Sequence, residues 1–420
     1  MALDSQTLET SGNGILSTAL TTLVKNVHPS SRIEMKSLNT QLPLVTTSKI
    51  RQFDAYCNQF EDVIRLTLGQ PLFPTPSPVK AKAKEAIDRN ITYYTPNIGA
   101  EATIESVLQY CRERFDLHYG KDEILITVGS TEALTASLRS LLNDGDEVLI
   151  PAPVYPGYEP LVNLYNATAV HVDTRRDRFE LTPETLQKQI TPRTKCIIIT
   201  DPNNPTGVIN SRKNRDRLAA FLAETDLYIL ADEVYNRIIY TDDYRSFGTY
   251  ENLRKRLIIV NSFSKSHSMT GWRIGFLLAD NDLIKELMKS HQYYVTSACS
   301  VTQYAIQAIN DAQTERELAV MVRDYRACRD YAWPFLCELG FTTPQMPQGA
   351  FYLFLSVEKF GLDGDTFARR LVEEQGVAII PGSAFNDRYK NYVRLSYCID
   401  LESLKKALDK IKVFVEGLQA

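Results

Sequence analysis

The chain has 420 residues, of which 44% are hydrophobic and 23% charged, with a formal net charge of −4. These values are ordinary for a soluble enzyme of one large and one smaller domain, and they exclude the basic footprint of a nucleic-acid-binding protein. No apolar run reaches the roughly 18–20 residues of a membrane span. The seven cysteines and five histidines show no metal-ligand spacing. We therefore expect no metal site, and reduced thiols in the cytoplasm.

Residues 1–34 differ in composition from the rest of the chain. Ser, Thr, Asn and Gly dominate, and Asp4 and Glu9 stand where a secretory signal would carry positive charge. Such a segment is too polar to bury a core, so we expect a weakly ordered tail. Met35, directly after it, is a candidate alternative start.

Seven apolar runs follow one another from residue 124 on, separated by segments of helical or turn character. Continuous apolar strands predict a largely parallel sheet that is covered on both faces, and thus an α/β fold. Ligands in such sheets bind beyond the carboxyl ends of the strands, where the polar motifs of this chain lie. The runs are 124–128, 148–150, 167–172, 196–200, 227–231, 257–260 and 274–279.

Small and polar residues mark the turns after three of these runs. Gly129, Ser130 and Thr131 begin a helix, where free N–H groups and the helix dipole attract anions. Tyr155 lies in a Pro-Val-Tyr-Pro-Gly turn, and Asn204 lies in an Asn-Asn-Pro-Thr-Gly turn. The first of these turns is therefore a candidate phosphate site.

Two ionisable residues near the ends of strands need a partner. Asp232 closes an apolar run, and an unpaired buried carboxylate is unfavourable, so it requires a cation. Lys265 lies between the last two runs, and a deprotonated lysine amine can form a Schiff base with an aldehyde. Ser262, Ser264 and Arg273 offer hydroxyl and guanidinium donors to a phosphate. A lysine amine beside a phosphate site predicts binding of pyridoxal 5′-phosphate (PLP).

These motifs resemble the class I and II aminotransferases, and the likeness covers about residues 45–415. The chain carries Ser-x-x-Lys…Gly-x-Arg-x-Gly from Ser262 to Gly275, Asn-Pro-Thr-Gly from Asn204 and Asp-x-x-Tyr from Asp232. The resemblance implies PLP fold type I, the aspartate aminotransferase fold. That fold has a large domain with a mostly parallel seven-stranded sheet and a smaller α+β domain.

The same resemblance implies a division of the chain and an oligomeric state. It places the large PLP-binding domain at 76–311 and the small domain at 35–75 and 312–420. In the family, the tyrosine that matches Tyr94 reaches the phosphate of the neighbouring subunit's cofactor. We therefore expect a homodimer with shared active sites.

Roles of single residues also follow from the resemblance. Lys265 holds the cofactor and moves the proton, and Asp232 keeps the pyridine nitrogen protonated. Asn204 and Tyr235 bind the phenolic oxygen, and Tyr155 stacks on the ring. The implied phosphate contacts are Gly129, Ser130, Thr131, Ser262 and Arg273. The implied substrate contacts are Gly69, Asn204 and Arg394, of which Arg394 clamps the α-carboxylate through two parallel hydrogen bonds.

The expected reaction moves an amino group from an L-amino acid to a 2-oxo acid, with 2-oxoglutarate as the expected acceptor. Within the family, 50–54, 265–276, 290–293 and 381–385 look most like the bacterial aminotransferase A group. That group includes N-acetyl-L,L-diaminopimelate aminotransferases of lysine biosynthesis. An aromatic amino acid aminotransferase and a PLP-dependent C–S lyase are alternatives on the same fold. A PLP-binding regulator would need an added helix-turn-helix module, for which residues 1–34 are too short.

Overall fold

The computed structural model describes residues 35–45 and 47–419, so the tail expected at 1–34 lies outside the described residues. Residues up to Leu42 belong to a separate unit, and the fold described below is that of the chain from Pro43 on. Among the described helices, none combines the length and apolar character that crossing a membrane requires.

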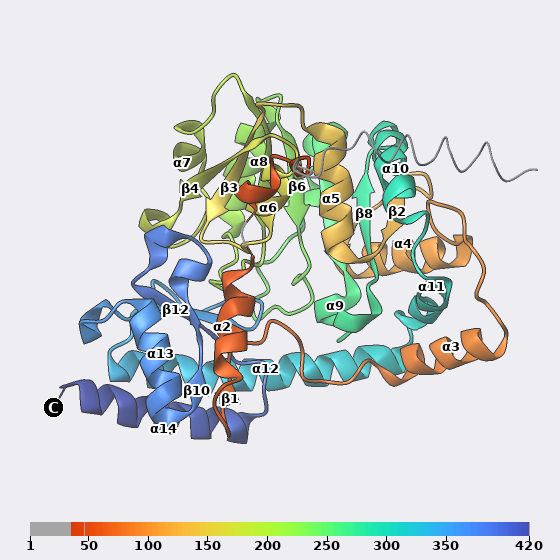
Figure 1. Cartoon of the computed structure of the whole chain (residues 1–420). Coiled ribbons are helices and arrows are strands. Elements are labelled where there is room, and N and C mark those ends of the chain that lie inside the picture. The colour runs from red at the N-terminus through yellow and green to blue at the C-terminus, as the bar shows by residue number, and fades with distance from the viewer. Residues whose placement is uncertain (1–34, 46, 420) are drawn as a thin grey trace, which may run out of the picture. The chain divides into compact units, whose positions relative to one another are not determined.

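The described residues form a sheet of seven strands in the order β2-β8-β7-β6-β5-β3-β4 (Figure 1). The pairs among β3, β4, β5, β6 and β7 are parallel, as the continuous apolar runs predict. Each of the seven runs became one strand, which confirms the mostly parallel α/β fold. The strands are β2 Ile124–Thr127, β3 Glu147–Ala152, β4 Thr168–Asp173, β5 Thr194–Thr200, β6 Tyr228–Asp232, β7 Leu257–Ser262 and β8 Gly275–Ala279.

The direction of β8 is a feature that the apolar pattern did not predict. β8 runs antiparallel to both of its neighbours, β2 and β7. It therefore starts on the side of the sheet where the carboxyl ends of β2 and β7 lie. Arg273, which precedes β8, thus lies on the same side as Lys265, which follows β7.

Helices cover both faces of this sheet because successive strand residues point to opposite sides. Ile198 of β5 packs in one buried cluster with Leu134 of α5 and Leu287 of α10. Its neighbour Ile197 packs in another cluster with Val107 of α4. The helices around the sheet are α4 Glu101–Phe115, α5 Gly129–Leu141, α6 Tyr158–Asn163, α7 Pro183–Gln187, α8 Arg212–Ala223, α9 Phe263–Ser266, α10 Asn281–Val295 and α11 Ser300–Ala305.

The C-terminal part of the chain builds a separate antiparallel sheet in the order β11-β12-β9, and a short parallel pair joins β1 to β10. Arg394 lies at the centre of β12, opposite Phe354 of β9 and Ile380 of β11. The strands are β1 Ile64–Arg65, β9 Tyr352–Ser356, β10 Val377–Ala378, β11 Ile380–Pro381 and β12 Tyr392–Ser396. The remaining helices are α2 Lys49–Cys57, α3 Ser77–Asp88, α12 Ala312–Leu339, α13 Gly364–Gln375 and α14 Leu401–Gln419.

Candidate active site

A cavity of about 1250 Å³ lies beyond the carboxyl ends of the parallel strands and is also lined by residues of α2 and β12. It brings together most of the residues expected from the sequence: Gly69, Ser130, Thr131, Tyr155, Asn204, Asp232, Tyr235, Lys265, Arg273 and Arg394. Gly129, Ser262 and Tyr94 are not among the residues that line the cavity. The strand-end motifs therefore converge as the parallel sheet requires.

Lys265 lies in α9, the short helix that directly follows the buried strand β7. Its Nζ donates a hydrogen bond to the Gly69 carbonyl oxygen at 2.5 Å. Burial lowers the pKa of the Lys265 amine to about 8, and the nearby Arg394 and Arg273 guanidinium groups act in the same direction. A substantial fraction of this amine is thus neutral and nucleophilic near neutral pH.

Asp232 ends β6 inside the protein. Its carboxylate accepts hydrogen bonds from the Tyr158 hydroxyl at 2.6 Å and from the Val234 N–H at 3.3 Å. Burial raises the pKa of the carboxyl to about 6, against the lowering effect of the Tyr158 hydrogen bond. A cation placed against Asp232 would lower that pKa again and stabilise the carboxylate.

Tyr158 is a site residue to which the sequence motifs assigned no role. It is fully buried, and its hydroxyl also lies 2.9 Å from Thr200 Oγ1 at the end of β5. It is thereby fixed between two strand ends and orients Asp232. The available signal was its position three residues after Tyr155, where α6 begins.

Arg394 is a buried guanidinium without a carboxylate partner among the described residues. Its Nη1 donates to Asn204 Oδ1 at 3.1 Å and its Nη2 to the Thr67 carbonyl at 2.6 Å, whereas Nε has no hydrogen-bond partner. Its Cζ lies 4.5 Å from the centre of the Tyr352 ring, a cation–π contact. Burial lowers the pKa of this guanidinium, and a buried cation of this kind is stabilised by an incoming carboxylate.

Tyr235 follows β6 by one turn, and its hydroxyl lies 2.9 Å from that of Tyr352. Both rings are buried, and both line the cavity. Asn204, held by Arg394, lines it from the end of β5. These residues provide hydroxyl and amide groups beside Asp232 and Lys265.

An anion cup is built where β2 ends and α5 begins. Gly129 has a φ of +75°, which strains residues other than glycine, and a Cβ added there would lie 2.5 Å from Arg273 Nη2 and displace this guanidinium. Ser130 and Thr131, in the first turn of α5, line the cavity together with Arg273. Positive charge and free helix N–H groups thus meet at one point, which suits a phosphate.

Ser262, which we expect to contact the phosphate, does not itself line the cavity. Its hydroxyl accepts the Ser264 N–H at 3.4 Å and caps α9, and the residue is buried. Ser264, two residues further, lines the cavity instead, as does Thr270. The role of Ser262 in the structure is to hold the helix that carries Lys265.

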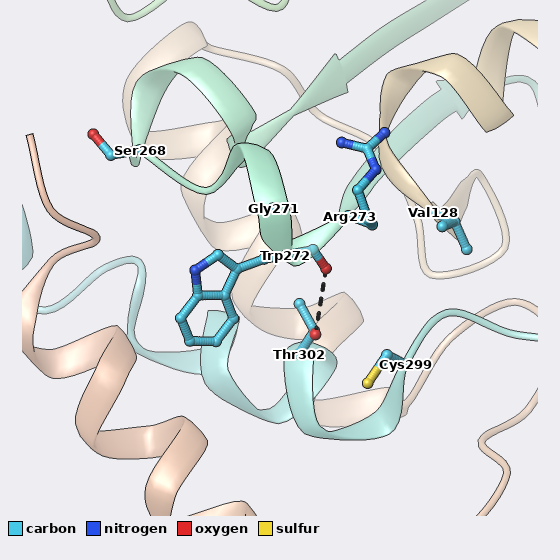
Figure 2. A pocket seen from close by; sticks show the side chains of 7 residues that line it. All are labelled: Val128, Ser268, Gly271, Trp272, Arg273, Cys299 and Thr302. Carbon is cyan, nitrogen blue, oxygen red and sulfur yellow. Dashed lines mark hydrogen bonds between the residues drawn. The ribbon is translucent and has the colours of Figure 1, made fainter. Parts of the chain in front are cut away.

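Figure 2 shows the other side of Arg273, where a second cavity of about 610 Å³ opens. The Arg273 side chain extends away from Thr302 and Cys299, and Thr302 Oγ1 donates a hydrogen bond to the Trp272 carbonyl at 3.5 Å. Arg273 and Gly271 line both cavities, so the anion cup can be approached from two sides.

A buried pair, Glu132 and His291, supports the helix of the anion cup. His291 Nδ1 lies 3.1 Å from Glu132 Oε1 and Nε2 lies 3.0 Å from the Asn97 carbonyl oxygen. The other Glu132 oxygen accepts the Val128 N–H at 3.2 Å. Glu132 therefore ties the first turn of α5 to α10 and to the loop that carries Tyr94.

The residues present fit PLP in chemistry and in placement. The cup offers hydroxyl, N–H and guanidinium donors for a phosphate, and Asp232 offers a buried carboxylate for a protonated ring nitrogen. Lys265 offers a partly neutral amine for an aldehyde, and Tyr155 offers an aromatic ring at the cavity wall. Tyr94 is 85% exposed and lies outside this set in its own chain.

Comparison with known proteins gives the same assignment. The family model of aminotransferase class I and II matches residues 61–411. The chain is 42% identical to the probable N-acetyl-LL-diaminopimelate aminotransferase of Bacillus subtilis over 380 residues, which is 90% of this chain and 95% of that protein. It is 36% identical to the aromatic-amino-acid aminotransferase 2 of Thermococcus litoralis, over 90% of this chain and 97% of that protein.

Comparison with solved structures supports the same family assignment. The aspartate aminotransferase of Thermus thermophilus with maleate superposes with a TM-score of 0.85 at 31% identity, covering 90% of this chain and all of that one. The shared fold is the aspartate aminotransferase type, with its mostly parallel seven-stranded sheet. The family match over residues 61–411 includes each strand end that lines the cavity. The chain therefore belongs to the class I and II aminotransferases, a family of PLP-dependent transferases.

Proposed function

We propose that Lys265 binds PLP in this cavity and is the group that moves the proton during transamination. The observation that carries the proposal is the convergence of Lys265, Asp232 and Arg394 on one cavity, although they are far apart in the sequence. When bound, PLP supplies a ring that accepts the electrons left at the substrate α-carbon. Asp232 would hold the proton on the ring nitrogen, and Tyr235 and Asn204 would hold the phenolic oxygen.

Arg394 would bind and orient the substrate through its α-carboxylate. Its buried guanidinium and its unpaired Nε support this role, because a carboxylate satisfies both. The substrate α-carbon would then face Lys265 Nζ, which removes its proton as general base and later returns one as general acid. A pKa of about 8 suits an amine that works in both directions near neutral pH.

For the substrates, we propose 2-oxoglutarate as amino acceptor and N-acetyl-L,L-diaminopimelate as donor, which would place the enzyme in lysine biosynthesis. The 42% identity to the B. subtilis relative supports this choice. Aromatic amino acids are the second candidate donor class. They are favoured by the aromatic side chains of Tyr155, Tyr352 and Phe385 on the cavity wall and by the similarity to the T. litoralis enzyme.

A panel of amino donors with 2-oxoglutarate as acceptor tests this proposal. The panel should contain N-acetyl-L,L-diaminopimelate, phenylalanine, tyrosine, aspartate and cysteine, with glutamate and ammonia both quantified. We expect glutamate to form in step with donor consumption and the highest kcat/KM for the diaminopimelate derivative. The highest value for phenylalanine would establish the aromatic alternative. Ammonia without an acceptor requirement would establish a lyase.

We also propose that the enzyme is a homodimer in which Tyr94 serves the other subunit's anion cup. The exposure of Tyr94 and its absence from the lining of its own cavity support this role, as does the second opening beside Arg273. The inactive Lys265→Ala variant and an impaired Tyr94→Ala variant can be mixed to test it. A mixed dimer would have one doubly defective and one intact site, so each mixed dimer should have about half the activity of a wild-type dimer, and a fully exchanged equal mixture should approach about a quarter of wild type. If subunit exchange is verified by mass and activity stays at the parental average, Tyr94 does not act across the interface.

The cytoplasm is the location we propose. All seven cysteines lie in the described part of the chain and none forms a disulfide, which suits a reducing compartment. We also keep the division into a large domain at 76–311 and a small domain at 35–75 and 312–420 as a proposal. The buried cluster around β9, β12 and α12 supports it, and Tyr235 and Ile238 join that cluster from the large domain.

A further inference from the structure

Several buried polar atoms without a hydrogen-bond partner in the described chain belong to one group of side chains. We call this group the buried charge cluster and define it by Asp201, Arg215, Glu233 and Tyr244. Burial raises the pKa of the Tyr244 phenol, and the charges of the other three residues also act on it, so the four groups lie close together. None of them lines the active-site cavity. Unpaired buried polar groups destabilise a fold, so this cluster requires an explanation.

Arg215 is the cation of this cluster, and Asp201 is its partner. Its Nη1 lies 3.5 Å from Asp201 Oδ2, and both side chains are at most 2% exposed. Glu233 is held separately, since its Oε1 accepts from the Ser246 hydroxyl and the Phe247 N–H, each at 2.9 Å. Burial raises the pKa of the Asp201 carboxyl to about 7, and Arg215 acts in the opposite direction. Asp201 therefore depends on Arg215 to remain ionised near neutral pH.

Asp201 begins the turn that carries Asn204. It directly follows β5, and its Oδ1 accepts the Asn210 N–H at 3.1 Å, which joins the two ends of the turn. Between these ends, the Asn203 N–H donates to the Val208 carbonyl oxygen at 3.0 Å. One oxygen of the Asp201 carboxylate thus closes the turn, and the other oxygen is available to anchor it.

Arg215 connects this turn to the segments that surround it. It lies in the first turn of α8, and its N–H donates to the Ser211 carbonyl oxygen at 2.8 Å. Its Nη2 donates to the Asp243 carbonyl oxygen, and its Cζ lies 5.6 Å from the centre of the Tyr244 ring. Because the side chain is closed off from solvent, it cannot reach another partner without losing these contacts. Arg215 is therefore a fixed anchor for the turn.

The position of Asn204 matters for two proposed contacts of the active site. Its Oδ1 accepts from Arg394 Nη1 at 3.1 Å, and Arg394 is the proposed ligand of the substrate α-carboxylate. Its amide is also proposed to hold the phenolic oxygen of PLP. A displacement of about 1 Å in a positioning contact can cost about a hundredfold in rate. A turn that is free to move would therefore weaken both contacts at once.

We infer that Arg215 is a positioning residue for transamination, which holds the 201–210 turn, and with it Asn204, through the Asp201 carboxylate. The inference rests on the proposed function, because it assumes the proposed contacts of Asn204. It deepens that function by adding a residue that contacts neither substrate nor cofactor. Since Arg215 does not line the cavity, its variants change the position of Asn204 without removing a group that binds either of them.

Hydrogen exchange of the apoprotein, followed by mass spectrometry, tests the anchor independently of turnover. In Arg215→Met, the backbone amides of 201–210 should exchange about tenfold faster, because the turn loses one buried tie. Arg254→Met is the matched control. It removes a guanidinium that pairs with Glu123 at 2.7 Å, at the amino end of β2, and it should leave exchange of the 201–210 turn unchanged.

A double-mutant cycle on kcat/KM shows whether Arg215 acts through Asn204. Arg215→Met and Asn204→Ala should each lower kcat/KM at least about tenfold, and combining them should cost less than about threefold beyond Asn204→Ala alone. Independent losses would multiply instead. KM for the amino donor should rise in Arg215→Met, since Arg394 loses its support, whereas a fraction of unfolded enzyme would lower only kcat.

One further variant separates positioning from stability. The double variant Arg215→Met, Asp201→Asn leaves neither charge of the pair unpaired, so its denaturant midpoint should be close to that of wild type. Its kcat/KM should still be at least about tenfold below wild type, because the anchor is missing. It also takes the place of Arg215→Met in the exchange and kinetic measurements if that single variant does not fold.

Three results would overturn the inference. One is exchange of the 201–210 turn that is unchanged by loss of the anchor, or accelerated equally in Arg254→Met. Another is full multiplication of the two losses in the cycle. The third is a wild-type kcat/KM in the double variant. Failure of every donor to transaminate would refute the proposed function, whereas the exchange comparison would still decide whether Arg215 holds the turn.

Discussion

The inner and outer parts of the active-site cavity are built in different ways. The inner part, which we call the floor, consists of Asn204, Asp232, Tyr235, Lys265 and Arg394. Four of these are at most 6% exposed, and each of the five is held by a hydrogen bond to another part of the fold. The outer part, which we call the mouth, consists of exposed side chains on α2, on α6 and the turn before it, and on the segment before β12: Lys49, Arg51, Tyr155, Glu159, Asp387 and Arg388.

This contrast separates the chemistry from the choice of substrate. Asp232 and Arg394 lie in paired strands, whose neighbours fix the backbone, and Asn204, Tyr235 and Lys265 lie in the segments that follow β5, β6 and β7. A change there disturbs several partners at once. The mouth residues lie on surface elements with few shared contacts, so they can vary with little effect on the fold. Changes at the floor should therefore abolish the reaction, and changes at the mouth should alter which substrates react.

The largest effect is expected for Lys265→Ala. Without the amine, no group in the floor can hold the cofactor covalently or move the substrate proton. Turnover should fall to the detection limit, while the circular dichroism spectrum and the melting temperature of the apoprotein stay close to wild type. Lys49→Ala, at the mouth, serves as the control for removing a lysine from the same cavity. Turnover of Lys265→Ala within a hundredfold of wild type would refute its central role.

Asp232→Ala should lower kcat by about a thousandfold or more with PLP still bound. Removing the carboxylate leaves the ring nitrogen without its anionic partner, which weakens its capacity to accept electrons. Measuring kcat by single-turnover absorbance, and PLP binding by fluorescence, separates the two properties. Tyr158→Phe removes only one hydrogen bond to Asp232, so a loss of about tenfold is expected for it. A kcat for Asp232→Ala within tenfold of wild type would mean that another group holds the ring nitrogen.

Glu132→Ala tests the support of the anion cup rather than the floor. The variant leaves buried His291 and the Val128 N–H without their carboxylate partner. Breaking a buried pair in this way should lower the free energy of unfolding by about 3 kcal/mol. Denaturant unfolding of the apoprotein measures it. Glu101→Ala, which removes an exposed pair with Lys121, should cost less than about 1 kcal/mol. Equal losses in the two variants would contradict the supporting role of Glu132.

The smallest of the expected effects is a pH dependence. Burial lowers the pKa of Lys265 to about 8, so the protonated, unreactive amine predominates below that pH and the neutral amine above it. At pH 7 about one-tenth of this amine is neutral, against roughly one part in 2,500 for an ordinary lysine with a pKa of about 10.4. The rate of PLP association with the apoprotein should rise about tenfold from pH 7 to 9. If the midpoint of this pH dependence lay near 10, the residues around Lys265 would not lower the pKa of its amine.

Three floor residues stand at or just after an apolar run that forms a strand, and both features are local, whereas Arg394 lies at the centre of β12. Asp232, Lys265 and Asn204 could each be located by a run and a turn. The reversal of β8 could not be predicted, since an apolar run does not indicate strand direction. Ser262 and Ser264 are two residues apart, and only the capping geometry of α9 shows which one faces the cavity.

Contacts between distant parts of the chain were not predictable from single motifs. Tyr352 meets Tyr235 across 117 positions, and Glu132 meets His291 across 159. The charge of the mouth depends on which of its groups are already paired, as Lys49 is with Asp387. Only the assembled cavity reveals these pairs. The Arg51 stretch resembled part of a family subgroup in the sequence but had no chemical role there. The sequence alone therefore did not predict the pairing of charged residues at the mouth.

The most direct test of this account is to find the lysine that carries the cofactor. The PLP-loaded enzyme should be reduced with borohydride and digested, and the peptides sequenced by mass spectrometry. We expect a pyridoxyl phosphate modification in stoichiometric amount on Lys265 alone, and none in Lys265→Ala treated in parallel. Stoichiometric modification of another lysine, with Lys265 unmodified, would contradict the assignment of the floor.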